Sequence, residues 1–226
     1  MKIQITPERY VAVDDYFSQL LLADDTIPAK VLAHCEAHAM PAIQVAPNQG
    51  KLLNLLVRIK GAKRILELGT LGAYSTVWMA LGMGQDGRIV TLDFDENYIK
   101  VARESLRIAG VADKVEIRVG RAAESMQALI DEAAVPFDFI FLDADKENNP
   151  HYLALALKLS APGTVIVADN VVRQGQILDA HSEGSNIKGL RRFFDDIAGN
   201  DKLSATAFQT VGSKGWDGLS VAIVNG

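Results

Sequence analysis

Two acidic segments in the second half of the chain could bind a divalent cation. Each ends a short apolar run of the kind that forms a buried strand: residues 141–146 (FLDADK) and residues 167–170 (VADN). If these strands are neighbours in a parallel sheet, Asp143, Asp169 and Asn170 meet at one edge. Oxygen donors without His or Cys suit Mg²⁺, with Ca²⁺ or Mn²⁺ as alternatives, rather than zinc.

A lysine accompanies this predicted cation site. Lys146 follows Asp143 by three residues, so its amino group can reach over a bound cation and accept a proton. The alternative is that acidic residues at strand ends only cap the following helices, which is the better interpretation for a single aspartate. Three oxygen donors from two strands favour the metal site.

A glycine-containing turn earlier in the chain could hold a nucleoside cofactor. Residues 67–75 (ELGTLGAYS) contain Gly69 and Gly72, which permit a tight turn and close backbone approach. Asp93 ends the next apolar run, where an acidic side chain can accept hydrogen bonds from ribose hydroxyls. The pattern is neither G-x-G-x-x-G nor a P-loop, so it predicts a ligand less anionic than a pyrophosphate. A bare strand-to-helix turn is the alternative.

The alternation of apolar runs predicts the sheet that would position these residues. Short strand-like runs alternate with amphipathic helices from Lys63 onward, as in a Rossmann-like α/β fold. The predicted parallel strands are Arg64–Leu68, Arg88–Leu92, Lys114–Val119, Phe137–Leu142 and Thr164–Ala168. The helices that follow the first four strands are predicted at Tyr74–Met83, Asp95–Ala109, Ala122–Ala133 and Pro150–Leu159.

The C-terminal part of the chain departs from a simple repeat of strand and helix. A helix is predicted at Ile187–Ala198, followed by two strand-like runs, Leu203–Val211 and Gly218–Val224, which are joined by a hairpin-like link. The whole is therefore a mostly parallel seven-stranded sheet with a C-terminal antiparallel hairpin.

The N-terminal segment, residues 1–46, carries no evident catalytic group. Helices are predicted at Glu8–Leu22 and Pro28–Ala39, and a third helix begins near Pro47. The apolar stripes of this segment exceed what one sheet face needs. We therefore predict a single domain, 1–226, in which residues 1–46 form a lid and part of a homodimer interface and residues 47–226 form the catalytic core.

Composition excludes several classes of protein. The 226 residues are 49% hydrophobic and 23% charged, which allows one sizeable core and argues against disorder. The net charge of −5 leaves no excess of basic residues for nucleic acid. No apolar run is long enough to span a membrane, the N-terminus lacks a secretory signal, and the single Cys35 permits no intrachain disulfide. We expect a cytoplasmic protein without nucleic-acid or membrane partners.

Three segments resemble the cation-dependent S-adenosylmethionine O-methyltransferases of the catechol and caffeoyl-coenzyme A type. They are residues 65–75, 141–146 and 169–171, in the family's order. Residues 45–50 (VAPNQG) are similar to the family's lead-in to its cofactor site, and residues 212–218 to its late hairpin. The resemblance covers the chain from about Pro47 to this hairpin and implies a class I methyltransferase fold.

The resemblance also implies a role for individual residues. Those expected to hold S-adenosylmethionine are Val45, Glu67, Gly69, Thr70, Ser75, Asp93, Ala122, Asp143, Asp145 and Tyr152. The divalent cation would be bound by Asp143, Asp169 and Asn170. Lys146 matches the position proposed as general base, so Lys146 and Asp143 are the candidate catalytic residues.

Two departures from the family pattern affect the predicted substrate. Ala73 stands where members often have glycine, which should be tolerable beside the cofactor. Residues 171–175 (VVRQG) lack the aromatic residue of the plant-type enzymes and border the predicted acceptor pocket, which argues against an acyl-coenzyme A acceptor. Arg173 in this run could face an acidic acceptor or solvent. We expect a small catechol-like phenol.

Other functions and sites stay open. A nucleotide-dependent oxidoreductase lacks its G-x-G-x-x-G here, and a non-catalytic cofactor-binding module would not need the acidic cluster or Lys146. RNA methylation is disfavoured by the net charge. His34 and His38 have zinc-ligand spacing but no evident third ligand, so we expect surface or interface histidines.

Overall fold

The computed structural model describes residues 6–226; residues 1–5, on which the prediction of no secretory signal partly rests, lie outside the described range. Within it, seven strands form one sheet in the order β3-β2-β1-β4-β5-β7-β6. Strands β1 to β5 pair in parallel, and β7 pairs antiparallel with β5 and β6, as predicted. The strands are β1 (Arg64–Leu68), β2 (Arg88–Asp93), β3 (Val115–Val119), β4 (Phe137–Leu142), β5 (Ser160–Asp169), β6 (Leu203–Gly212) and β7 (Gly215–Val224).

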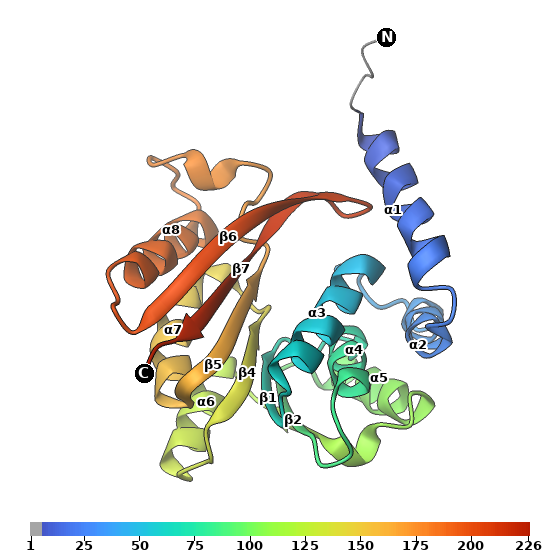
Figure 1. The fold of residues 1–226 in the computed structure, drawn as a ribbon, viewed down its shortest axis with the longest axis horizontal. Helices are drawn as coiled ribbons and strands as arrows, with labels where there is room; N and C mark the ends of the chain where they lie inside the picture. The colour runs from blue at the N-terminus through green and yellow to red at the C-terminus, as the bar shows by residue number, and fades with distance from the viewer. Residues whose placement is uncertain (1–5) are drawn as a thin grey trace.

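Helices cover both faces of this sheet (Figure 1). One face packs against α3 (Pro47–Lys60), α4 (Tyr74–Gly82) and α5 (Glu96–Ile108). The other packs against α6 (Ala122–Asp131), α7 (Asn149–Lys158) and α8 (Ser185–Ala198). Side chains of a strand alternate between faces, so Ile65 enters the first core and Leu66 the second. Both cores are apolar, which is why the central strands read as continuous hydrophobic runs.

Strands β5, β6 and β7 are longer than predicted. β5 begins at Ser160 rather than Thr164, and its pairing with β4 contains a register shift between Phe137 and Phe139. β6 and β7 remain paired as far as Gly212 and Gly215, so a turn of only two residues, Ser213 and Lys214, joins them. Gly215 has φ +87°, a conformation that glycine adopts without strain.

The first helix, α1 (Pro7–Leu21), projects from the body of the molecule and buries none of its residues. Figure 1 shows the tip of the β6–β7 hairpin reaching toward it. There the Asp14 carboxylate accepts a hydrogen bond from the backbone N–H of Ser213 at 2.7 Å. The next helix, α2 (Thr26–Ala37), does enter the core through Val31 and Cys35. In the described part of the chain, no helix is long and apolar enough to cross a membrane.

Three strand ends are joined closely around Gly69. The Gly69 N–H donates to the Leu92 carbonyl, and the Asp143 N–H donates to the Leu68 carbonyl, each at 2.9 Å. Gly69 has φ +96°, and a Cβ atom added there would lie 2.2 Å from the Asp143 carbonyl oxygen. Only glycine therefore allows β1 and β4 to present their following residues side by side.

Replacement of this glycine should destabilise the fold. We expect Gly69→Ala to lower the free energy of unfolding by about 2 kcal/mol or more, because the methyl group combines steric overlap with an unfavourable φ. Gly84→Ala is the matched control, since Gly84 has no positive φ and open space where its Cβ would be. Urea denaturation of both variants measures the difference, and equal stabilities would contradict this account.

Candidate active site

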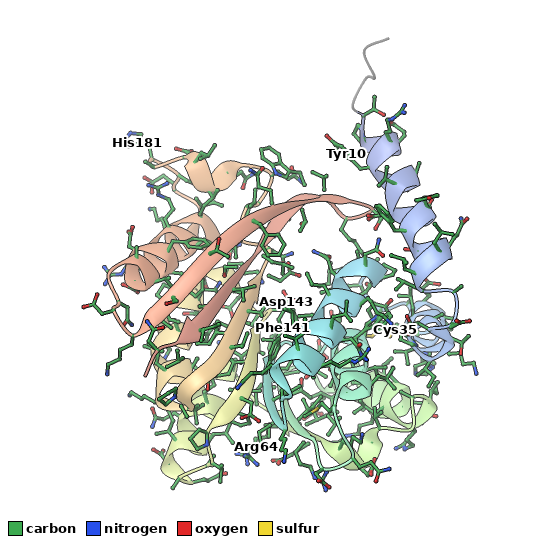
Figure 2. All side chains as sticks on the ribbon, viewed as in Figure 1. Tyr10, Cys35, Arg64, Phe141, Asp143 and His181 are labelled. Carbon is green, nitrogen blue, oxygen red and sulfur yellow. The ribbon has the colours of Figure 1, made fainter. Side chains whose placement is uncertain are left out.

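A cavity of about 840 Å³ opens at the carboxyl ends of β1, β2 and β4. Figure 2 shows Asp143 near the middle of the molecule. Arg64, the first residue of β1, lies away from it, where the parallel strands begin. The predicted cofactor residues on the cavity wall are Val45, Gly69, Thr70, Ser75, Asp93, Ala122, Asp143, Asp145 and Tyr152. The volume suits a ligand of nucleoside size.

Glu67 is placed behind this wall rather than on it. Its side chain is fully buried and accepts hydrogen bonds from the hydroxyls of Ser75 (2.6 Å), Thr76 (2.5 Å) and Thr91 (2.7 Å). Burial raises the pKa of Glu67 to about 7, although the three hydroxyls act in the opposite direction. Glu67 therefore fixes the start of α4, and Ser75 in turn faces the cavity.

Asp93 holds the turn that carries the glycines. One of its carboxylate oxygens accepts the backbone N–H groups of Thr70 (3.1 Å) and Leu71 (2.8 Å), and the other accepts that of Asp95 (3.0 Å). Asp95 caps α5 by accepting the N–H of Asn97 at 2.8 Å. The helix cap and the cavity residue are thus different aspartates.

An aromatic side chain at the cavity rim was not predicted. Phe94 follows Asp93, lines the cavity and is 73% exposed. A large apolar side chain left in solvent beside a cavity is a common sign of a ligand surface. The available signal was an aromatic residue between two aspartates just after a strand, where no core position is expected.

Lys146 and Asp143 form a close pair at the end of β4. The Lys146 amino group donates to the Asp143 carboxylate at 2.9 Å, and Lys146 is 6% exposed. Helix α8 packs closely against the backbone of Lys146, because a Cβ atom on Gly189 would lie only 2.4 Å from the Lys146 carbonyl oxygen. The two predicted catalytic residues are therefore brought together in a confined position.

Asp169 and Asn170 follow the neighbouring strand, as predicted. Asp169 is 2% exposed, and its carboxylate accepts the Asn170 N–H at 2.7 Å. Burial, together with the nearby Asp143 carboxylate, raises the pKa of Asp169 to about 7. A bound cation would compensate these buried charges, and two carboxylates with one amide oxygen form a suitable donor set for Mg²⁺.

A second cavity of about 350 Å³ lies between these residues and the C-terminal hairpin. Asn170 and Arg173 line both cavities, so the two spaces share a wall. Trp216 of β7 also lines the smaller cavity. Asp217 fixes the loop after β5 by accepting the N–H groups of Val172 (2.9 Å) and Arg173 (3.0 Å).

The two histidines with zinc-ligand spacing lie side by side at the end of α2. The His34 and His38 rings lie 4.3 Å apart, between centroids. Among the described residues, no group of three or more His, Cys, Asp and Glu side chains is arranged to hold a metal. The proposed cation site differs from such a group, because Asp143 and Asp169 are joined there by the amide of Asn170.

The O-methyltransferase family model matches residues 23–218 of the chain. The chain belongs to this O-methyltransferase family. Catechol O-methyltransferase of Niastella koreensis is 46% identical over 216 residues, which cover 95% of this chain and 97% of the relative. This membership confirms the enzyme class, an S-adenosylmethionine-dependent O-methyltransferase, and does not favour the oxidoreductase alternative.

Solved O-methyltransferase structures share the whole fold. The Bacillus cereus enzyme in complex with SAH has a TM-score of 0.95 at 50% identity, covering 97% of this chain and 100% of that one. The Streptomyces achromogenes enzyme of tomaymycin synthesis, in complex with SAM, has a TM-score of 0.94 at 42% identity, covering 99% and 100%. These matches confirm the predicted Rossmann-like methyltransferase fold.

The buried Glu67 should give the O-methyltransferase a characteristic pH dependence of stability. The pKa of Glu67 is about 7 in the folded protein, against an ordinary value of 4.5. Between pH 4.5 and 7 the folded state therefore binds more protons than the unfolded state, and the protein loses stability as the pH rises through this range. Glu67→Gln stays neutral, and we expect it to gain about 3 kcal/mol relative to wild type across this range.

Urea denaturation at a series of pH values measures this gain. The exposed variant Glu183→Gln is the control, because its side chain is 90% exposed. Parallel stability curves for Glu67→Gln and wild type would show that the Glu67 carboxylate is not perturbed by burial.

Proposed function

We propose that the enzyme transfers a methyl group from S-adenosylmethionine to a hydroxyl of a small catechol-like phenol chelated by a divalent cation, most simply Mg²⁺. The observation that carries the proposal is the convergence of Asp143, Asp169 and Asn170, with Lys146 beside them, where the two cavities share a wall. The name of the Niastella relative supports the choice of acceptor.

The larger cavity would hold S-adenosylmethionine, which supplies an electrophilic methyl group. Gly69, Thr70 and Ser75 would line its methionine part, Asp93 its ribose and Ala122 its adenine. The Asp93 oxygens already accept three backbone N–H groups, so this carboxylate is fixed before the cofactor binds. Preorganisation of this kind reduces the ordering cost of binding.

The divalent cation would lie among Asp143, Asp169 and Asn170, where it would lower the pKa of a coordinated hydroxyl. Lys146, held beside Asp143, would accept the proton released from the acceptor. The residues shared by the two cavities would orient the acceptor oxygen toward the methyl group of S-adenosylmethionine. Alignment of this kind can contribute about 7–11 kcal/mol to the rate of a displacement.

The reaction can be tested by S-adenosylhomocysteine formation from catechol. We expect turnover that requires Mg²⁺, is abolished by EDTA, and falls by at least about 100-fold in Asp169→Ala and Lys146→Met. Lys158→Met, an exposed lysine on α7, is the matched control and should retain activity. Turnover that persists in EDTA or in both variants would exclude the proposed chemistry.

We also propose that residues 1–46 form a lid and that α1 packs against a second copy of the chain. Ile43, Gln44 and Val45 line both cavities, which supports a lid role for this segment. The apolar stripe of α1 lies in solvent, and its members are Val13, Tyr16, Phe17 and Leu20, exposed by 48%, 59%, 45% and 61%. A stripe at this spacing is typical of a helix that packs against a partner.

Sedimentation velocity at micromolar concentration tests the second copy. Wild type should sediment as a dimer, and Phe17→Glu with Leu20→Glu should shift it to a monomer, because buried charges oppose association. Gln19→Glu adds a charge to an exposed position outside the stripe and should leave the dimer intact. A wild-type monomer would refute this arrangement.

A further inference from the structure

Positive charge collects in the smaller cavity beside the proposed cation site. Arg173 and Lys214 both line this cavity, together with Asp169 and Asn170. Among the described residues, neither Arg173 nor Lys214 forms an ion pair with a carboxylate within 4.0 Å, although seven such pairs occur elsewhere. The two cations are thus available to a ligand.

Lys214 is exposed, but a hydrogen bond to the chain holds its amino group at the cavity. It occupies the two-residue turn of the hairpin, and its amino group donates to the Ala42 carbonyl oxygen at 2.8 Å. An ammonium group has three N–H donors, so two remain for a ligand. Partial burial lowers the pKa of Lys214, since the charged form is less well solvated there.

Arg173 is held by its backbone. Its φ is +52°, a left-handed conformation that is unfavourable for a residue with a side chain, and Gln174 beside it has φ +55°. The Arg173 N–H donates to Asp217 at 3.0 Å, which helps to keep the loop in this shape. The strained loop leaves Arg173 lining both cavities, next to Asn170.

Two carboxylates are the negative charges on the remaining walls of the smaller cavity. The other polar side chains of the cavity are neutral: Gln44, Gln49, Gln174, Gln176 and Thr210. Its carboxylates are Asp169, assigned to the cation, and Asp217, one oxygen of which accepts three backbone N–H groups. With a divalent cation bound, the acceptor end of the site therefore attracts anions.

We propose that the preferred acceptor is an ortho-dihydroxylated aromatic acid whose carboxylate binds Arg173 and Lys214 while its hydroxyls face the cation site. This inference rests on the proposed function and narrows it. A cavity of about 350 Å³ lies at the small end of ligand sites, which fits a single-ring acid. A catecholamine would instead place its ammonium group against two cations.

A matched pair of acceptors tests the charge of the substrate. 3,4-Dihydroxybenzoate and 3,4-dihydroxybenzamide share ring and shape but differ in charge. With S-adenosylmethionine and Mg²⁺, we expect kcat/KM to be at least about tenfold higher for the acid, because charge-assisted hydrogen bonds are the stronger ones. Equal values for the two compounds, with turnover intact, would overturn the inference and leave the proposed function standing.

Variants then connect the preference to the two side chains. Arg173→Gln and Lys214→Gln should each reduce the acid-to-amide ratio by about tenfold, mainly through KM of the acid, and Lys214→Arg should restore it. Arg192→Gln, which removes the same charge from a side chain 71% exposed on α8, is the control. A purely structural effect would lower kcat/KM equally for the acid and the amide, and this result would contradict the assignment.

Calorimetry separates this inference from the proposed reaction. If neither compound is methylated, the proposed function fails, yet binding of both to the S-adenosylhomocysteine complex can still be measured. Tighter binding of the acid, lost in Arg173→Gln and Lys214→Gln, would support an anion-binding subsite. Equal binding of acid and amide would refute it.

Discussion

The site depends on the cost of burying carboxylate side chains near the C-terminal ends of the parallel strands. Glu67 and Asp169 are both almost completely removed from solvent, which is costly for a charged group unless partners compensate it. Glu67 receives three hydroxyl hydrogen bonds, whereas the Asp169 side chain receives only the N–H of its neighbour Asn170. The protein satisfies the first carboxylate, whereas the second fits the cation that we propose.

Two further carboxylates shape the loops rather than meet the reacting atoms. Asp93 gathers backbone N–H groups of the glycine turn after β1, and Asp217 gathers those of the loop after β5. Asp93 therefore fixes a wall of the larger cavity, and Asp217 fixes the loop that carries Arg173, on the wall that the two cavities share. Residues of one chemical type thus divide into supporting and reactive groups according to what surrounds them.

The sequence predicted the central strands well because both faces of a parallel strand are buried. Arg64–Leu68 and Phe137–Leu142 have the predicted bounds. The early start of β5 was missed, since it contains Pro162 and Gly163, which normally end strands. The hairpin strands were also longer than predicted, because their pairing continues through glycines at the turn.

The site was predictable as a set of residues but not as an arrangement. Motif resemblance located nine cofactor-binding candidates on the wall of the larger cavity, yet it could not show that Glu67 lies behind them. Gln44 and Lys214 were missed as cavity-lining residues, because the lining depends on which loops meet in space. Nor could helical periodicity reveal that the apolar stripe of α1 is left in solvent.

The central claim is that Asp143, Asp169 and Asn170 bind one divalent cation beside the cofactor. The most direct measurement is the anomalous scattering of Mn²⁺ in a crystal grown with S-adenosylhomocysteine and a catechol. A single peak within about 2–2.5 Å of oxygens from all three side chains is the predicted result. A peak elsewhere, or none among these residues when Mn²⁺ supports turnover, would contradict the account.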